Sequence, residues 1–159
     1  MRSSSSALIT ESEAMDMCIR LLARRDYSAG NLRKKLAAKS VNEDIVHRVL
    51  TRIQELGYQD DVRYAAAYVR YGISQGKGPG WIAAQLFQKG IEKNLIDESL
   101  ASAEVDWSEL AAQQLRRKFR QAVEDQKELA RCFRYLASRG FQPDVIKSAV
   151  DGLKSDAAY

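Results

Sequence analysis

The most constraining feature of the sequence is a spacing of 50 residues that recurs along most of its length. Leu36, Leu86 and Leu136 are separated by this spacing. The same shift aligns further apolar positions: Val41 with Ile91 and Phe141, Ile45 with Leu95 and Val145, Val46 with Ile96 and Ile146, and Leu50 with Leu100 and Val150. Internal periods of about 20–50 residues are typical of tandem repeat proteins. The sequence therefore predicts three tandem units.

Each unit is predicted to contain three helices, because its apolar residues lie three or four apart and capping residues separate the apolar stretches. In the first unit the helices are expected over 13–25, after the N-cap Ser28, and from Asn42 or Asp44 to the stop at Gly57. In the second unit they are expected over 62–75 after the capping pair Asp60–Asp61, from about Pro79, and after Gly90.

The third unit is expected to begin at Asp106, with helices carrying Leu110 to Val123, over about 127–139, and after Pro143. The predicted boundaries of the three repeats are 11–58, 59–105 and 106–154, with disordered tails at 1–10 and 155–159. A unit of about 50 residues buries little apolar surface alone, so neighbouring units are expected to share contacts. The predicted fold is all-α, with three three-helix repeats forming an elongated, curved row.

Composition and motifs argue against several classes of protein. No apolar run approaches the roughly 18–20 residues that span a bilayer, and the serine-rich start is too weakly apolar for a signal peptide, so a cytoplasmic protein is expected. Cys18 and Cys132 are interpreted as small core residues, and His47 as a surface or boundary residue. Without a nucleotide-binding, nucleophile-elbow or metalloprotease motif, we expect no enzyme, cofactor or metal site.

Two basic clusters are the best candidates for binding a partner. The first cluster contains Arg33, Lys34, Lys35 and Lys39, and the second contains Arg116, Arg117, Lys118 and Arg120. Arg24 and Arg25, which precede the first cluster, are further candidate contacts. Cations packed this densely around a helix cannot all pair with carboxylates four residues away, so phosphate or an acidic protein surface is a reasonable partner. A solvated helix face remains the alternative interpretation of each cluster. The second unit is the least basic, with more Asp and Glu than Lys and Arg between residues 60 and 109.

Aromatic residues in the second unit admit two interpretations. Tyr64, Tyr68 and Tyr71 have the spacing of a buried helical stripe, although such rings can also stack on unpaired bases. Core packing is the preferred interpretation, and Trp81 is the best candidate for exposure because Ile82 and Leu86 already supply its helix with a buried face.

Three stretches of the chain resemble the RecX family of bacterial recombination regulators: residues 22–28 (LARRDYS), residues 57–65 (GYQDDVRYA), and Gly78–Pro79 together with Lys89–Gly90–Ile91. The resemblance covers most of the chain, and the middle stretch is its most specific part. It implies a row of three-helix modules that binds the RecA filament in its groove on DNA and suppresses its ATPase, strand-exchange and coprotease activities. Asn31 and Gln85 depart from the family, which often carries glutamate at these positions.

Two functional hypotheses follow. The first is a non-catalytic, monomeric regulator whose partner is the RecA filament, with single- or double-stranded DNA as a further partner and no membrane association. The second is a stand-alone DNA-binding protein that uses tandem helix-turn-helix-like modules. Against the second, the third helices of the first two units carry few basic side chains.

Overall fold

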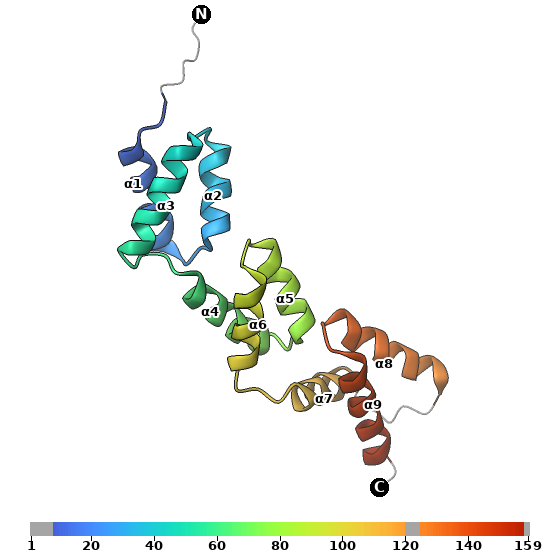
Figure 1. Ribbon diagram of the computed structural model, residues 1–159. Coiled ribbons are helices and arrows are strands. Elements are labelled where there is room, and N and C mark those ends of the chain that lie inside the picture. The colour runs from blue at the N-terminus through green and yellow to red at the C-terminus, as the bar shows by residue number, and fades with distance from the viewer. Residues whose placement is uncertain (1–7, 120–124, 158–159) are drawn as a thin grey trace, which may run out of the picture.

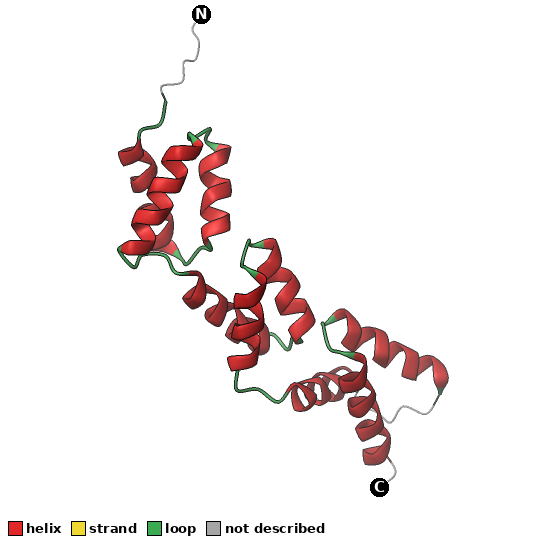
Figure 2. Ribbon diagram, in the orientation of Figure 1, coloured by secondary structure: helices red, strands yellow, loops and turns green. Residues whose placement is uncertain are grey.

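The protein is an elongated row of helices. The structure, a computed structural model, describes residues 8–119 and 125–157. Over these residues it contains nine helices and no strand (Figure 2). Figure 1 shows three groups of three helices following one another from the N-terminal to the C-terminal end, so the all-α repeat architecture is confirmed.

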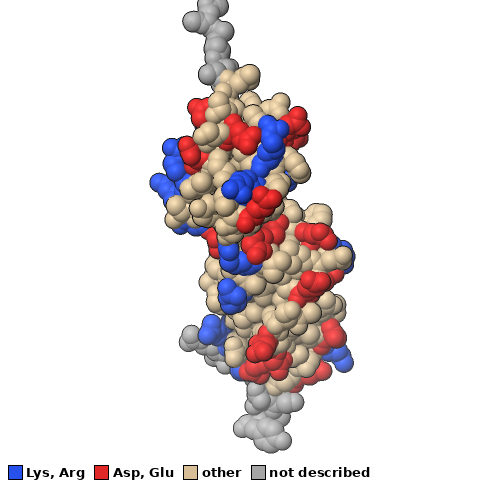
Figure 3. Space-filling view, turned by 60° about the vertical axis from the view of Figure 1, so that its left-hand side comes forward, with Lys and Arg blue, Asp and Glu red and all other residues tan. Residues whose placement is uncertain are grey.

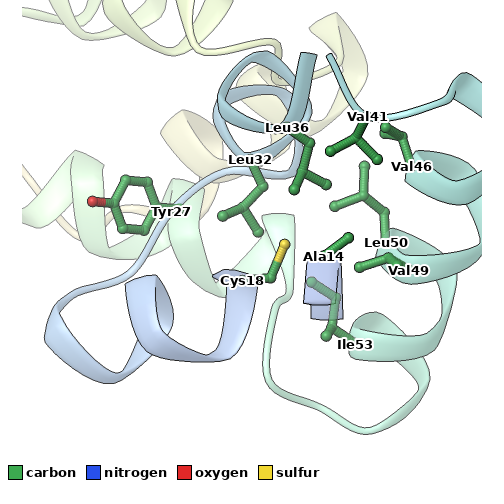
Figure 4. Close-up of a cluster of buried hydrophobic side chains, with 10 residues drawn as sticks. All are labelled: Ala14, Cys18, Tyr27, Leu32, Leu36, Val41, Val46, Val49, Leu50 and Ile53. Atoms are coloured by element: carbon green, nitrogen blue, oxygen red, sulfur yellow. The ribbon is translucent and has the colours of Figure 1, made fainter. Parts of the chain in front are cut away.

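The first repeat contains α1 (Glu11–Arg24), α2 (Ala29–Ala38) and α3 (Glu43–Glu55). Thr10 and Glu13 cap α1 reciprocally, each side chain accepting a hydrogen bond from the backbone N–H of the other residue. Ser28 caps α2 as predicted, and of the two candidates for α3 it is Asn42 that provides the cap. Figure 4 shows the resulting core, in which side chains from all three helices converge and Tyr27 lies to one side.

The second repeat contains α4 (Asp61–Ser74), α5 (Pro79–Gln88) and α6 (Lys93–Ser102). Asp60 accepts hydrogen bonds from the backbone N–H groups of the first turn of α4, which confirms its capping role. Pro79 occupies the start of α5, where its missing N–H has no partner to lose. The core of this repeat is built around Ala65, Val69, Ile82, Leu86, Ile91 and Ile96.

The third repeat contains α7 (Trp107–Lys118), α8 (Gln126–Ser138) and α9 (Pro143–Ala157). Helix α9 continues to Ala157, so the prediction that the chain is disordered from residue 155 is wrong for residues 155–157. The apolar pattern ends at Leu153, but helical hydrogen bonding extends beyond it. Val123, which was assigned to the first helix of this repeat, lies outside the described residues.

Both cysteines occupy the cores, as expected. Cys18 lies in the first core and Cys132 in the third, and each is a buried free thiol. Burial raises the pKa of the Cys18 thiol to about 11, since the charged thiolate is penalised among apolar side chains. His47 is exposed on α3, which agrees with its interpretation as a surface residue.

The first junction between repeats joins the end of α5 to the start of α2. The Ser28 hydroxyl donates to the carbonyl oxygen of Lys89 at 2.7 Å. A Cβ atom on Gly30 would lie 2.6 Å from the same carbonyl oxygen, so the two helices approach this closely only because residue 30 lacks a side chain. Asp61 adds a second link, since its carboxylate accepts from the Ala29 N–H at 2.9 Å.

The second junction joins the end of α8 to the start of α5 at the equivalent positions, 50 residues further along. The N–H of Gly78 donates to the carbonyl oxygen of Arg139 at 2.7 Å, and that of Gly80 to the carbonyl oxygen of Gly140 at 2.9 Å. The guanidinium of Arg139 donates in turn to the carbonyl oxygens of Gln75 and Gly76. Helices α2, α5 and α8 therefore follow one another end to end, on the right-hand side of Figure 1.

Other residues replace the junction glycines at the equivalent positions of the first and third repeats that take no part in a junction. Gly30 and Gly80 correspond to Ala130, and Gly90 and Gly140 correspond to Ser40. Ser40 keeps the left-handed backbone conformation, with φ of 58°, although it is not glycine. Neither Ser40 nor Ala130 faces another repeat in the described part of the chain, so neither position has to admit a neighbouring backbone.

Candidate interaction surface

The first basic cluster is spread around α2 instead of forming one face. All four of its side chains are exposed. Lys34 reaches toward the second repeat, where its Nζ donates to the carbonyl oxygen of Gln88 at 3.4 Å. Lys35 and Lys39 lie one helical turn apart and border a groove between α1 and α2, opposite Arg24. The structure therefore brings together three of the predicted contact residues and directs Lys34 elsewhere.

Arg25 belongs to a different contact, at the end of α1. Its guanidinium lies 4.5 Å from the centre of the Tyr27 ring. Hydrogen bonding with Arg25 lowers the pKa of Tyr27, and the same interaction raises the pKa of Arg25. Arg25 is thus held against an aromatic ring at the first junction.

The second basic cluster is divided as well. Arg116 forms an ion pair with Glu109 at 3.2 Å, so part of its charge is already neutralised. Lys118 lies on another side of α7, with its Nζ 5.7 Å from the centre of the Tyr135 ring. Arg117 is exposed. Arg120, the fourth predicted contact, lies outside the described residues.

Seven basic side chains of the described residues lie within 4.5–5.8 Å of the centre of an aromatic ring. They are Arg25 and Lys35 over Tyr27, Lys89 over Tyr68, Lys77 over Trp81, Lys118 and Arg139 over Tyr135, and Arg131 over Phe119. We call these basic and aromatic residues the cation–aromatic row. A cation within about 6 Å of a ring centre is attracted by the negative face of the ring, so these contacts hold basic side chains beside aromatic ones in every repeat.

The row continues across both junctions. At the first junction, burial raises the pKa of Tyr64 and the positive charge of Arg25 partly opposes this rise, while Tyr64 stacks on Tyr68 with ring centres 6.1 Å apart. Tyr68 stacks in turn on Trp81 at 6.3 Å. At the second junction, burial and then the positive charge of Arg139 lower the pKa of Lys77. The row therefore connects residues from all three repeats.

Exposure of the aromatic side chains differs from the prediction at two positions. Trp81 is half-buried instead of exposed, because it stacks on Tyr68 and its backbone packs against Gly140. Tyr71, assigned to the core stripe, is 51% exposed and touches Tyr68 edge to face. Tyr64 and Tyr68 are half-buried, so the core interpretation holds for them only in part.

Sequence reasoning missed several contributors to this surface. Arg131 and Arg134 lie three residues apart on α8 and line a shallow depression of about 330 Å³ with Lys118. Their spacing was a usable signal, because residues three apart share a helix face. Phe87 was missed as well, and it is 72% exposed at the end of α5.

Basic residues on the third helices are mostly engaged in ion pairs. Arg48 pairs with Glu11 at 2.7 Å, Arg52 with Glu55, Lys93 with Asp97, and Lys147 with Asp151. Each partner is exposed, so these pairs add little stability. They do lower the net positive charge that α3, α6 and α9 present. Figure 3 shows that acidic side chains predominate on the right-hand side of its lower half and basic ones on the left.

The described residues contain no group of three or more His, Cys, Asp or Glu side chains placed to hold a metal ion. No described helix combines the length and the apolar character needed to span a membrane. The features of the described surface that could bind a partner are its charged side chains, its aromatic rings and its grooves.

Models of three successive RecX domains match this chain in order. The first three-helix domain matches residues 14–52, the second residues 60–100 and the third residues 104–150. The chain belongs to the RecX family. The matched segments overlap α1–α3, α4–α6 and α7–α9 in turn, so each observed repeat corresponds to one RecX domain.

Relatives of known name support the same assignment. The regulatory protein RecX of Actinobacillus pleuropneumoniae serotype 5b is 36% identical over 151 residues, which cover 95% of this chain and 99% of the relative. That of Halorhodospira halophila is 38% identical over 147 residues, covering 91% of both chains. Both relatives are named as regulatory proteins, so a regulatory role in this family is supported.

Crystal structures agree with the observed architecture. A crystal structure of regulatory protein RecX matches with a TM-score of 0.77 and 29% identity, over 89% of this chain and 73% of that chain. The structure of RecX from Lactobacillus salivarius matches with a TM-score of 0.79 over 91% of this chain and 97% of that one. At 21% identity this second likeness concerns the fold.

Proposed function

We propose that this RecX-family chain is a non-catalytic, cytoplasmic regulator that binds the RecA filament on DNA and inhibits its ATPase, strand-exchange and coprotease activities. The observation that carries the proposal is the cation–aromatic row, which connects all three repeats along an elongated chain. A filament offers the same surface many times, and a row of similar modules is suited to contacting successive copies.

The energetic advantage of such a row is multivalency. Once one repeat has bound, the next is held close to its own site, so the later contacts form at a high effective concentration. A spacing between repeats that matches the spacing of the sites raises this effective concentration further. The hydrogen bonds from Ser28 to Lys89 and from Gly78 to Arg139 supply a defined spacing, because they fix each repeat against the next. Individually weak contacts then add up to firm binding by a monomer.

The chemistry of the row suits two kinds of surface present on a protein–DNA filament. Its cations attract phosphates and acidic side chains, and cations held over rings keep their charge available at the surface. Exposed rings such as Tyr71 also offer flat apolar faces, on which unpaired bases stack. DNA within the filament is therefore included as a further partner.

The test is a titration of this protein into RecA hydrolysing ATP on single-stranded DNA. We expect the rate of hydrolysis to fall to a low plateau as the filament becomes saturated. A rate that stays unchanged up to protein concentrations well above that of RecA would overturn the proposal. A parallel titration without RecA should show no ATP hydrolysis by this chain alone.

The alternative is a stand-alone DNA-binding protein with tandem helix-turn-helix-like modules. Such modules place a recognition helix in the major groove and need unpaired polar or basic side chains on it. The ion pairs of Arg48 and Lys93 with acidic neighbours speak against this use of α3 and α6. A salt titration of DNA affinity without RecA distinguishes the two, since tight sequence-selective binding would favour this alternative and weak, steeply salt-dependent binding the proposal.

A further inference from the structure

The groove between α1 and α2 combines an apolar floor with a basic rim. It has a volume of about 600 Å³ and is lined by Met17, Arg20, Leu21, Ala23, Arg24, Lys35, Ala38 and Lys39. Its floor is apolar, with Met17 and Leu21 half-buried. Its rim carries four basic side chains and no acidic one. A groove of this kind is an interaction surface whose occupant has to combine negative charge with apolar bulk.

The other two repeats carry pairs of aromatic rings at their first and second helices. In the second repeat, Tyr68 and Trp81 stack with ring centres 6.3 Å apart. In the third repeat, Phe119 and Tyr135 meet edge to face at 5.9 Å.

The first repeat lacks such a pair. A shift of 50 or 100 residues places Cys18 and Asn31 at the positions of Tyr68 and Trp81, and Ile19 and Lys35 at those of Phe119 and Tyr135. No described aromatic residue, Tyr27 included, lines the groove. Its apolar floor is therefore open to a side chain of a partner.

We infer that this groove binds an acidic segment of a partner protein, with a large apolar or aromatic side chain of that segment packing on Met17 and Leu21. The four basic side chains of the rim would pair with its carboxylates. An amphipathic helical segment suits such a groove, because it presents apolar and acidic residues on neighbouring faces. The inference goes beyond the proposed function, because it concerns the first repeat alone and does not depend on which protein carries the segment.

The test measures binding of a labelled synthetic peptide to the full chain by fluorescence anisotropy, without RecA or DNA. The probe is a short helix-forming peptide of glutamates with a Leu and a Phe on one face. We expect saturable binding, and affinity at least about tenfold weaker for a control peptide with Ser at the two apolar positions. Equal affinity for both peptides, or no binding of either, would overturn the inference.

Two variants of the chain locate the site. The double variant K35E/K39E reverses charge at two exposed rim residues, and we expect it to weaken binding at least about tenfold. Its matched control is R52E/K93E, which changes net charge equally at exposed positions away from the groove. Equal loss of affinity in both would overturn the inference, since it would show attraction to overall charge only.

Ala38→Trp separates the apolar part of the site from its charge. Ala38 is exposed on the groove wall, so the fold should tolerate the larger side chain, which circular dichroism would verify. The indole would occupy part of the groove, and we expect it to abolish peptide binding while net charge stays the same. Unchanged binding in a folded A38W protein would overturn the inference. Competition by an unlabelled DNA oligonucleotide as strong as that by the unlabelled peptide would also overturn it, by identifying a phosphate site.

Discussion

Gly140 lies so close to Trp81 that a Cβ atom at position 140 would overlap the backbone nitrogen of Trp81. This contact sets the distance between the second and third repeats. Gly140 also has a φ of 95°, a conformation that residues with side chains rarely adopt. The position therefore requires glycine for two independent reasons, and each can be measured separately.

Replacing Gly140 by alanine should destabilise the protein by about 3 kcal/mol, because the backbone strain adds to the overlap with Trp81. Urea unfolding followed by circular dichroism measures this loss. We expect the third repeat to unfold at lower urea concentration than the first two, since the junction that supports it is weakened.

Gly57 provides the matched control for this substitution. It has a similar φ of 80°, but no atom lies within 4 Å of the position of its Cβ. Gly57→Ala should therefore show only the cost of the backbone conformation, about 1 kcal/mol. Equal losses at positions 57 and 140 would mean that the close approach to Trp81 contributes nothing to stability.

Asp61 is expected to be the main polar link of the first junction. Its Oδ1 accepts from the Ala29 N–H at 2.9 Å and from Gln59 Nε2 at 2.8 Å, and Gln59 is only 2% exposed. Asp61→Ala would leave both donors without this acceptor, and we expect a loss of about 1–3 kcal/mol in the free energy of unfolding. Asp61→Asn keeps an acceptor oxygen and should lose less, so an equal loss would contradict this role.

The buried Cys18 thiol makes stability depend on alkaline pH. Its pKa in the folded protein is about 11, above the ordinary value of 9. A group with a raised pKa stabilises the fold fully below its unfolded pKa, and the contribution disappears as pH rises through the folded pKa. Stability should therefore fall between about pH 9 and pH 11, by up to roughly 2–3 kcal/mol from this group.

Cys18→Ala isolates this effect from the titration of other groups. The variant should be less stable at neutral pH, by about 1 kcal/mol, because a buried sulfur is removed from the core. Its stability should then fall less steeply than that of the unaltered protein between pH 9 and pH 11. Parallel pH profiles of the two proteins would rule out the contribution of Cys18.

Contacts to the filament should be sensitive to the basic side chains of the third repeat. Changing Lys118, Arg131 and Arg134 to alanine removes three charges around one shallow depression, and we expect about tenfold weaker inhibition of RecA ATPase. The control variant changes Arg52, Lys93 and Lys147 to alanine. It also removes three positive charges, but from residues that are engaged in ion pairs. If both triple variants inhibit equally well, the depression lined by Lys118, Arg131 and Arg134 is not part of the contact surface.

Much of the fold could be predicted from the periodic spacing of apolar residues, because the buried face of each helix repeats them every three or four positions. The spacing of Leu36, Leu86 and Leu136 predicted three equivalent units, and all three leucines are fully buried. Capping residues were equally informative, since Ser28 and Asp60 act through neighbours only two or three residues away. Local signals of this kind are present in the sequence itself.

The surface was harder to predict because it depends on contacts between distant residues. A run such as Arg33–Lys34–Lys35 shows how much positive charge a helix carries. It does not show which way each side chain points, because successive residues project from different sides of a helix. Trp81 was misjudged because its partner is Gly140, which contributes backbone and leaves no apolar signal. The groove of the first repeat is lined from two helices, α1 and α2, so it becomes visible only when both are placed in space.

The second junction is made mainly by main-chain atoms, with the N–H groups of Gly78 and Gly80 donating to the carbonyl oxygens of Arg139 and Gly140. The carbonyl oxygen is present in every residue type, and the N–H group in every type except proline. The step from this repeat to the next is therefore set by peptide geometry, and side chains elsewhere on the helices can change without altering it. The spacing between the repeats and the side chains on their surface are therefore independent of each other. Surface residues that contact a partner can change in evolution while the distance from one repeat to the next stays the same.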